Sequence, residues 1–246
     1  MIKIFPIFLL LLFSVWDMQA QEEADTEPVF SADEPIFDLT VEMEMGFPIR
    51  DFKHKIDKGV LWGKGIGLFY HFEAVPVEAG LRFGGFSYDH TRRKFDSGLA
   101  VQKTKNKIWI WTAVIRGEPD FNLPFKIYFE GTLGLRRYYS HTYSKYYGSA
   151  LFSDEDDDGR FDEAKLNSDW GMVYSGAVGV KILLEKNYGS ALDFQFGLKQ
   201  SRSGYFLVRN DLSQVQEEPI DNYNEEVGSL SMLSFRIGLS LPIFPD

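Results

Sequence analysis

The sequence predicts an all-β chain that folds as an eight-stranded antiparallel up-and-down transmembrane β-barrel. Three observations predict this fold: eight segments alternate apolar and polar residues, the connections between them alternate in length, and ionisable residues gather on the polar faces. Successive side chains of a strand point to opposite faces, so the alternation indicates one apolar and one polar face per strand. In a membrane barrel the apolar face contacts lipid.

The clearest strand covers residues 233–244, where apolar side chains occupy every second position and small or polar residues fill the gaps. The seven other predicted strands cover, in chain order, residues 37–47, 65–73, 77–84, 108–116, 125–136, 174–185 and 192–199. Segment 108–116 is apolar on both faces, which leaves its register open. Ten strands are the alternative if residues 140–152 or 202–208 extend the sheet.

Long and short connections alternate along the predicted barrel. The long ones cover residues 50–64, 89–107, 140–170 and 209–227, and the short ones cover residues 74–76, 117–124 and 186–189. Bacterial transmembrane barrels have long extracellular loops and short periplasmic turns. We therefore expect both termini to lie in the periplasm.

The segments before the first strand predict export. Residues 1–20 are interpreted as a cleaved signal peptide, because Lys3 precedes an apolar run and the small residue Ala20 follows it. Residues 21–35 are acidic and contain proline, which predicts a flexible periplasmic leader before a barrel of residues 36–246. No later segment is apolar over the roughly 20 residues that a transmembrane helix needs, so a membrane span would be built from strands.

The composition excludes several kinds of site and partner. The 246-residue chain contains no cysteine, so it has no disulfide, no thiolate metal site and no cysteine to carry a lipid anchor. Its formal net charge is −10, and an acidic exported protein is a poor candidate for nucleic-acid binding. We expect no nucleic-acid partner.

The polar faces of the predicted strands carry both acids and bases. We expect glutamates and arginines to pair across the lumen, and the predicted network comprises Glu42, Glu44, Glu130, Arg82, Arg136 and Arg236. A barrel of about eight strands has an interior just wide enough for side chains to fill, so this network would close it. The alternative is a narrow, wet channel lined by the same charges.

The last strand carries a second pattern, with a polar residue, a glycine and two hydrophobic residues at Arg236, Gly238, Leu241 and Ile243. This spacing resembles the carboxy-terminal targeting signal of bacterial outer-membrane barrels. Together with the strand pattern and the connections, it makes residues 36–244 resemble small outer-membrane barrels such as OmpX, the membrane domain of OmpA and the PorT-like family.

That resemblance implies residence in the outer membrane of a Gram-negative bacterium and insertion by the barrel-assembly machinery. It further implies a surface structural or interaction role, with outer-membrane lipid, lipopolysaccharide and an unidentified extracellular or periplasmic protein as partners. A component associated with transport or secretion, as in the PorT-like family, is the alternative.

The predicted loops divide into a basic and an acidic half. The loops 50–64 and 89–107 are rich in lysine and arginine, whereas 140–170 and 209–227 are rich in aspartate and glutamate. We expect basic residues to meet the phosphates of lipopolysaccharide, and the predicted contacts are Lys53, Lys55, Arg92, Arg93 and Lys94. The alternatives are ordinary solvated loops or pairing between the two halves.

An acidic motif in the third long loop suggests a calcium site. Alternating aspartates precede Gly159, as in the calcium loops of EF-hands, dockerins and thrombospondin type 3 repeats. The implied ligands are Asp154, Asp156, Asp158, the carbonyl oxygen of Arg160, and Asp162. Lys165 stands at the twelfth position, where such loops carry a bidentate carboxylate, so an unoccupied acidic loop is the alternative.

Catalysis is the least supported hypothesis. His141 adjoins Ser140 near the predicted outer rim, where the acyl chains of lipid A could reach it. Nothing in the sequence places a serine, a histidine and a carboxylate within mutual reach, and such triads are recognised by geometry. We expect no enzymatic activity, and a lipid A-modifying enzyme is the third hypothesis after the two above.

Overall fold

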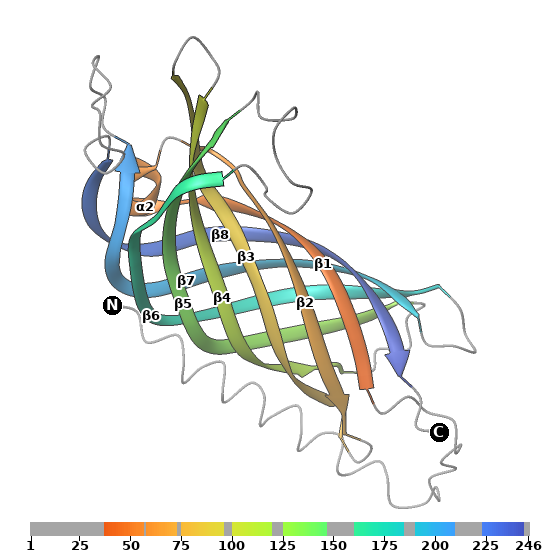
Figure 1. The fold of residues 1–246 in the computed structure, drawn as a ribbon. Coiled ribbons are helices and arrows are strands. Elements are labelled where there is room, and N and C mark those ends of the chain that lie inside the picture. The colour runs from red at the N-terminus through yellow and green to blue at the C-terminus, as the bar shows by residue number, and fades with distance from the viewer. Residues whose placement is uncertain are drawn as a thin grey trace, which may run out of the picture. The chain divides into compact units, whose positions relative to one another are not determined.

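In the computed structural model, eight antiparallel strands close into one barrel in chain order (Figure 1). The structure describes residues 37–56, 58–72, 75–95, 100–119, 125–146, 160–184, 190–209 and 223–243. The elements are β1 (Phe37–Pro48), α2 (Arg50–Lys55), β2 (Leu61–His71), β3 (Val77–Phe95), β4 (Ala100–Gly117), β5 (Lys126–Tyr146), β6 (Arg160–Leu183), β7 (Ala191–Arg209) and β8 (Tyr223–Ile243). The predicted eight-stranded fold is confirmed.

The ten-stranded alternative is wrong. Residues 140–146 prolong β5 and residues 202–208 lie inside β7, so both segments lengthen existing strands. Within the described ranges, no helix is long and apolar enough to cross a membrane.

The first and last strands close the ring. β1 pairs with β2 on one side and with β8 on the other, so that Leu39 lies opposite both Leu68 and Leu241. Closure gives every strand two neighbours and leaves no open sheet edge, as a sheet surrounded by hydrocarbon requires.

The strands extend further beyond one end of the belt than the sequence predicted. The predicted loop 89–107 is wrong, because β3 continues to Phe95 and β4 already begins at Ala100. Likewise, the predicted loop 140–170 shrinks to the interval between Tyr146 and Arg160. In these extensions both faces of the sheet carry polar residues, so the apolar and polar contrast that marks a strand is weak there.

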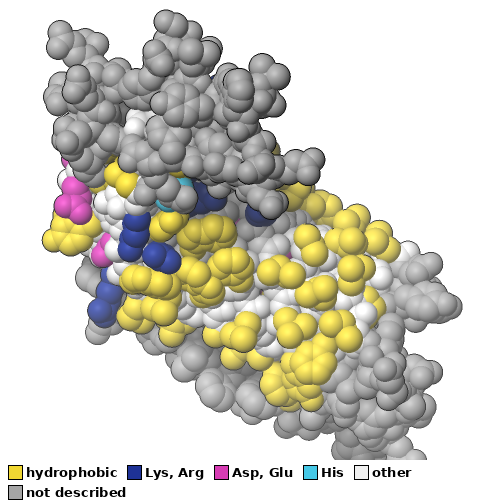
Figure 2. All heavy atoms as spheres, in the orientation of Figure 1, with side chains coloured by type: hydrophobic (Ala, Val, Ile, Leu, Met, Phe, Trp, Pro, Cys, Tyr) yellow, Lys and Arg dark blue, Asp and Glu magenta, His cyan; other side chains and the backbone are white. Residues whose placement is uncertain are grey.

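Exposed apolar side chains from all eight strands form a belt on the outside of the barrel, and Figure 2 shows one face of it. Leu81 on β3 is 69% exposed and Val41 on β1 is 54% exposed, although a soluble protein would bury such residues. The structure also settles the register of β4, because Ile108 and Ile110 are buried inside while Ile115 faces outward. The outward belt is the surface expected to contact lipid.

The lumen contains an apolar plug that the sequence did not predict. The short helix α2 brings Phe52 into the barrel, where it packs edge-on against Phe206 with 5.7 Å between ring centroids. The plug comprises buried apolar residues from α2, the segment after it and seven strands: Phe52, Ile56, Leu61, Phe86, Tyr88, Ile108, Ile110, Tyr138, Val173, Phe206, Leu230 and Met232. The inner face of the barrel is therefore apolar around Phe52, whereas the predicted lumen charges lie in another part of the barrel.

The outward belt leads to a prediction about stability in a bilayer. Replacing Leu81 with arginine places a charge in the middle of the belt and should lower the free energy of unfolding by about 2–4 kcal/mol. The matched control is Ser87→Arg, an exposed outward position on the same strand beyond the belt, which should cost about 0–1 kcal/mol. Urea unfolding in lipid vesicles measures both, and equal losses would show that Leu81 does not face hydrocarbon.

Candidate functional site

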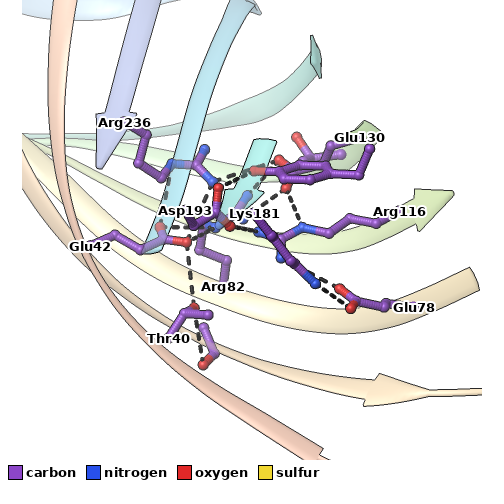
Figure 3. A network of polar contacts seen from close by, with 12 residues as sticks. Thr40, Glu42, Glu78, Arg82, Arg116, Glu130, Lys181, Asp193 and Arg236 are labelled. Atoms are coloured by element: carbon purple, nitrogen blue, oxygen red, sulfur yellow. Dashed lines mark hydrogen bonds and ion pairs between the residues drawn. The ribbon is translucent and has the colours of Figure 1, made fainter. Parts of the chain in front are cut away.

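The carboxylate of Glu130 on β5 lies at the centre of a network of charged side chains in the lumen (Figure 3). It accepts two hydrogen bonds from the Arg82 guanidinium, at 2.7 and 2.8 Å, and one from Arg116 Nε at 2.9 Å. Arg236 Nη1 lies 3.7 Å from the same carboxylate. Paired, bidentate contacts of this kind are the strongest hydrogen bonds between side chains, and they hold β3, β4, β5 and β8 together across the lumen.

Two further glutamates extend the network along β1. Glu42 accepts a hydrogen bond from Arg82 Nε at 3.1 Å and one from Arg236 Nη1 at 3.4 Å. Glu44 accepts hydrogen bonds from Lys199 Nζ on β7, at 2.8 and 3.0 Å to its two oxygens. Both pairs are almost fully buried, so each charge is compensated by a partner instead of by water.

A second group of charges lies beside the first. Lys181 Nζ binds the carboxylates of Glu78 and Glu118, and Arg116 Nη1 lies 3.4 Å from Glu78. Arg116 also stacks over the Phe69 ring at 4.0 Å, and its Nη2 lies 3.4 Å from Asp193. Through Arg116 this group joins the charges around Glu130, so the two groups form one connected set (Figure 3).

The structure brings five of the six predicted network residues together and corrects the sixth. Arg136 is buried, but its Nη1 lies 3.2 Å from Asp169 and its Nε donates a hydrogen bond to Ser201. Arg136 stands six positions beyond Glu130 on β5, which is about 20 Å at about 3.3 Å per residue. Its distance along the strand separates it from the three predicted glutamates.

Five charged residues of the predicted polar faces join the network although the predicted network did not include them. They are Glu78, Arg116, Lys181, Asp193 and Lys199. Their inward position follows from the alternation of each strand, but their partners depend on the register between strands, which the sequence does not give.

Little space remains between the charge network and the apolar plug. A cavity lies there, bordered by Glu44, Lys199 and Arg236 on the charged side and by Phe86 and Ile110 on the apolar side. Its volume of about 20 Å³ holds about one water molecule. It is too small for a substrate or for a hydrated ion.

The predicted lipopolysaccharide contacts do not form one described cluster. Lys53 is exposed on α2, whereas Lys55 forms an ion pair with Glu226 on β8 at 2.9 Å. Arg92 is exposed on β3, and the side chains of Arg93 and Lys94 lie outside the described residues. The ion pair between Lys55 and Glu226 joins a residue of the predicted basic half to one of the predicted acidic half. This contact agrees with the alternative that the two halves pair with each other.

The predicted calcium ligands fall largely outside the described residues. Asp154, Asp156 and Asp158 precede β6, and only the backbone of Arg160 and Asp162 is described, in the first residues of that strand. Calcium binding therefore stays a prediction.

One described cluster has the residue types of a metal site. His71 Nε2 lies 3.0 Å from Asp38, and His71 Nδ1 lies 3.1 Å from Glu78, with all ligand atoms within 4.8 Å of one another. The two carboxylates occupy opposite sides of the imidazole ring, and Glu78 also binds Lys181 and Arg116. This arrangement suits a histidine between two carboxylates better than a cation, which the nearby positive charges would repel.

Ser140 and His141 do not form a catalytic pair. Ser140 is buried on the inner face of β5, whereas His141 stacks on Tyr139 on the outer face, with 6.1 Å between ring centroids. Neighbouring residues of a strand point to opposite faces, so this serine cannot use the adjacent histidine as a base.

A closed ring of eight strands, an outward apolar belt and an inward set of paired charges define a small β-barrel of the outer-membrane type. The resemblance to such barrels that the sequence predicted is confirmed in fold, whereas the specific link to the PorT-like family stays a prediction. No protein-family model and no curated protein sequence matches the chain.

Solved outer-membrane barrels are similar to this chain at low identity. Neisserial surface protein A is 11% identical with a TM-score of 0.47, and the match covers 84% of this chain and 97% of that one. Ail, the attachment invasion locus protein of Yersinia pestis, is 12% identical with a TM-score of 0.44, covering 84% and 97%. The outer membrane protein AlkL is 12% identical with a TM-score of 0.36, covering 90% and 97%.

The burial of paired charges leads to a second prediction. Glu44→Gln removes the carboxylate that compensates Lys199 and should lower the free energy of unfolding by about 3–5 kcal/mol, because an uncompensated charge is left inside. The matched control is Glu226→Gln, which breaks the more exposed pair with Lys55 and should cost about 1 kcal/mol or less. Urea unfolding in vesicles compares them, and a loss at Glu44 no larger than at Glu226 would show that Lys199 does not depend on Glu44 for compensation of its charge.

Proposed function

We propose that this protein is a closed outer-membrane barrel that acts as a structural or interaction protein of the cell surface, and that solutes do not pass through its lumen. The observation that carries the proposal is the presence of two successive seals inside one barrel. The first is the charge network around Glu130, and the second is the apolar plug around Phe52.

The two seals resist different solutes. An apolar molecule would have to separate the buried ion pairs of the charge network. Each charge that loses its partner in these low-dielectric surroundings costs several kcal/mol. A hydrated ion would have to cross the plug, where the hydroxyls of Tyr88 and Tyr138 are the polar groups among buried rings and aliphatic side chains, too few to replace a hydration shell. A role in transport or secretion through the lumen would require both seals to open, so we favour the surface role.

The parts of the barrel beyond the apolar belt then carry the function. The β3–β4 and β5–β6 hairpins extend past the belt, and α2 is tied to β8 through Lys55 and Glu226. We propose that this end faces the outside of the cell, as the connection lengths predict, and that lipopolysaccharide or an external protein binds there. Interaction surfaces on small barrels lie where the strands leave the membrane, since the lumen is filled.

Electrical recording tests this proposal. The mature barrel in planar lipid bilayers should show no stable conductance, and Phe52→Ala should stay equally closed, because the charge network remains intact when the plug is weakened. A general diffusion porin inserted under the same conditions is the positive control. A large, stable conductance of the wild-type protein would overturn the proposal.

A further inference from the structure

Outward lysines follow the aromatic edge of the belt on β4. Trp111 and Trp109 are followed on the same face by Lys107, Lys105 and Lys103. The intervening side chains are buried on the inner face. The strand therefore presents two aromatic rings and then three cations in one line on the outer surface.

The register of the sheet adds a fourth cation and a third indole ring. Arg137 on β5 lies opposite Trp109 on β4 and opposite Trp170 on β6. Its guanidinium carbon lies 5.3 Å from the centre of the Trp170 ring, and its Nε donates a hydrogen bond to Ser168 at 2.8 Å. We define the basic-aromatic surface as Lys103, Lys105, Lys107, Trp109, Arg137 and Trp170.

Aromatic rings fix the level of this surface relative to the membrane. Phe83 stacks on Trp109 at 5.3 Å, and Trp111 stacks on Trp170 at 5.1 Å. Tryptophan concentrates at the boundary between hydrocarbon and headgroups, so the cations immediately beyond these rings stand in the headgroup layer. Lys and Arg side chains gather beside one end of the apolar belt in Figure 2.

Aromatic rings hold these cations against the sheet, and the described carboxylates do not form ion pairs with them. Lys107 Nζ lies 5.4 Å from the Trp109 ring and Lys105 Nζ lies 5.2 Å from the Tyr143 ring. Among the residues that the structure describes, no carboxylate lies within 4.0 Å of Lys105, Lys107 or Arg137. Cation–π contacts orient such groups and leave their outward N–H donors available.

His90 on β3 lies close to the same lysines. Partial burial lowers the pKa of His90 on β3, and the nearby Lys105 lowers it further. Lys103 and Lys58 act in the same direction, while Asp89 opposes them. The outer surface of β3 and β4 is therefore locally positive on a chain whose net charge is −10.

The geometry points to a binding site for the phosphate groups of outer-leaflet lipid A on the basic-aromatic surface. The phosphates contact Lys105, Lys107 and Arg137, and the acyl chains lie along the adjoining belt at Phe83 and Leu135. Lipid is the ligand that fits, because the cations continue directly from the lipid-facing surface. The inference deepens the proposed surface role and rests on the outward orientation proposed there.

This site differs from the lipopolysaccharide contacts predicted from the sequence. Those contacts were predicted in loops and lie on α2 and at the end of β3 in the structure, whereas the basic-aromatic surface lies on β4, β5 and β6. The alternating lysines at positions 103, 105 and 107 fell inside a predicted loop, where alternation has no structural meaning. Only their placement in a strand puts them on one face.

Titration of the full mature barrel in phosphatidylcholine nanodiscs tests the site. The ligand is lipid A with both phosphates, and the readout is the fluorescence of the tryptophans on the surface itself. Lys105→Gln/Lys107→Gln should weaken binding at least about tenfold, since each basic residue near a lipid surface contributes substantially to anion attraction. Lys126→Gln removes an exposed positive charge from the opposite end of β5, away from the basic-aromatic surface, and should change the affinity no more than about twofold.

Two comparisons complete the design. Dephosphorylated lipid A should bind weakly and equally to all variants, and inorganic phosphate should not compete at millimolar concentration. Equal affinity of the wild type and the Lys105/Lys107 variant, an equal loss in the control variant, or tight binding of dephosphorylated lipid A would each overturn the site. These outcomes are independent of conductance, so a conducting barrel would refute the proposed closed function without bearing on the lipid site.

Discussion

The arrangement of the barrel interior depends on one carboxylate. Glu130 is almost completely buried on β5 and is held by Arg82 from β3 and Arg116 from β4, with Arg236 of β8 close by. Each of these ions would cost several kcal/mol to desolvate alone, so each is compensated inside the lumen only when the side chains from the four strands meet. Because β8 also closes the ring against β1, this contact joins the closing strand to the middle of the sheet.

The same constraint divides the lumen into two levels. Ions gather where every charge finds a partner, and the apolar plug fills the level where inward positions carry rings and aliphatic chains. Close packing at the charged level needs small residues on the wall. A side chain at Gly179 would collide with the ring of Tyr128, which lies beneath the Arg116 guanidinium with its centre 4.7 Å away. The inside of the barrel is thus a packed core that contains charges.

Much of the fold could be predicted from the sequence because hydrocarbon imposes a strict alternation on lipid-facing strands. Residues 37–47 and 233–243 show it, and both lie in strands of the structure. Where a strand leaves the belt the alternation loses its contrast, so the lysines at 103, 105 and 107 were assigned to a loop. Phe52 was missed because it enters the lumen from a helix outside the sheet, and the partner of Arg136 depends on register between strands.

A double-mutant cycle between Arg82 and Glu130 tests the central claim, that buried opposite charges hold the lumen closed. The free energy of unfolding in vesicles is measured for the wild type, Arg82→Gln, Glu130→Gln and the double variant. The account predicts a coupling energy of about 1.5 kcal/mol or more, because the two side chains share a bidentate contact in a dry interior. Additivity within about 0.5 kcal/mol would contradict it and would show that the lumen charges are solvated individually.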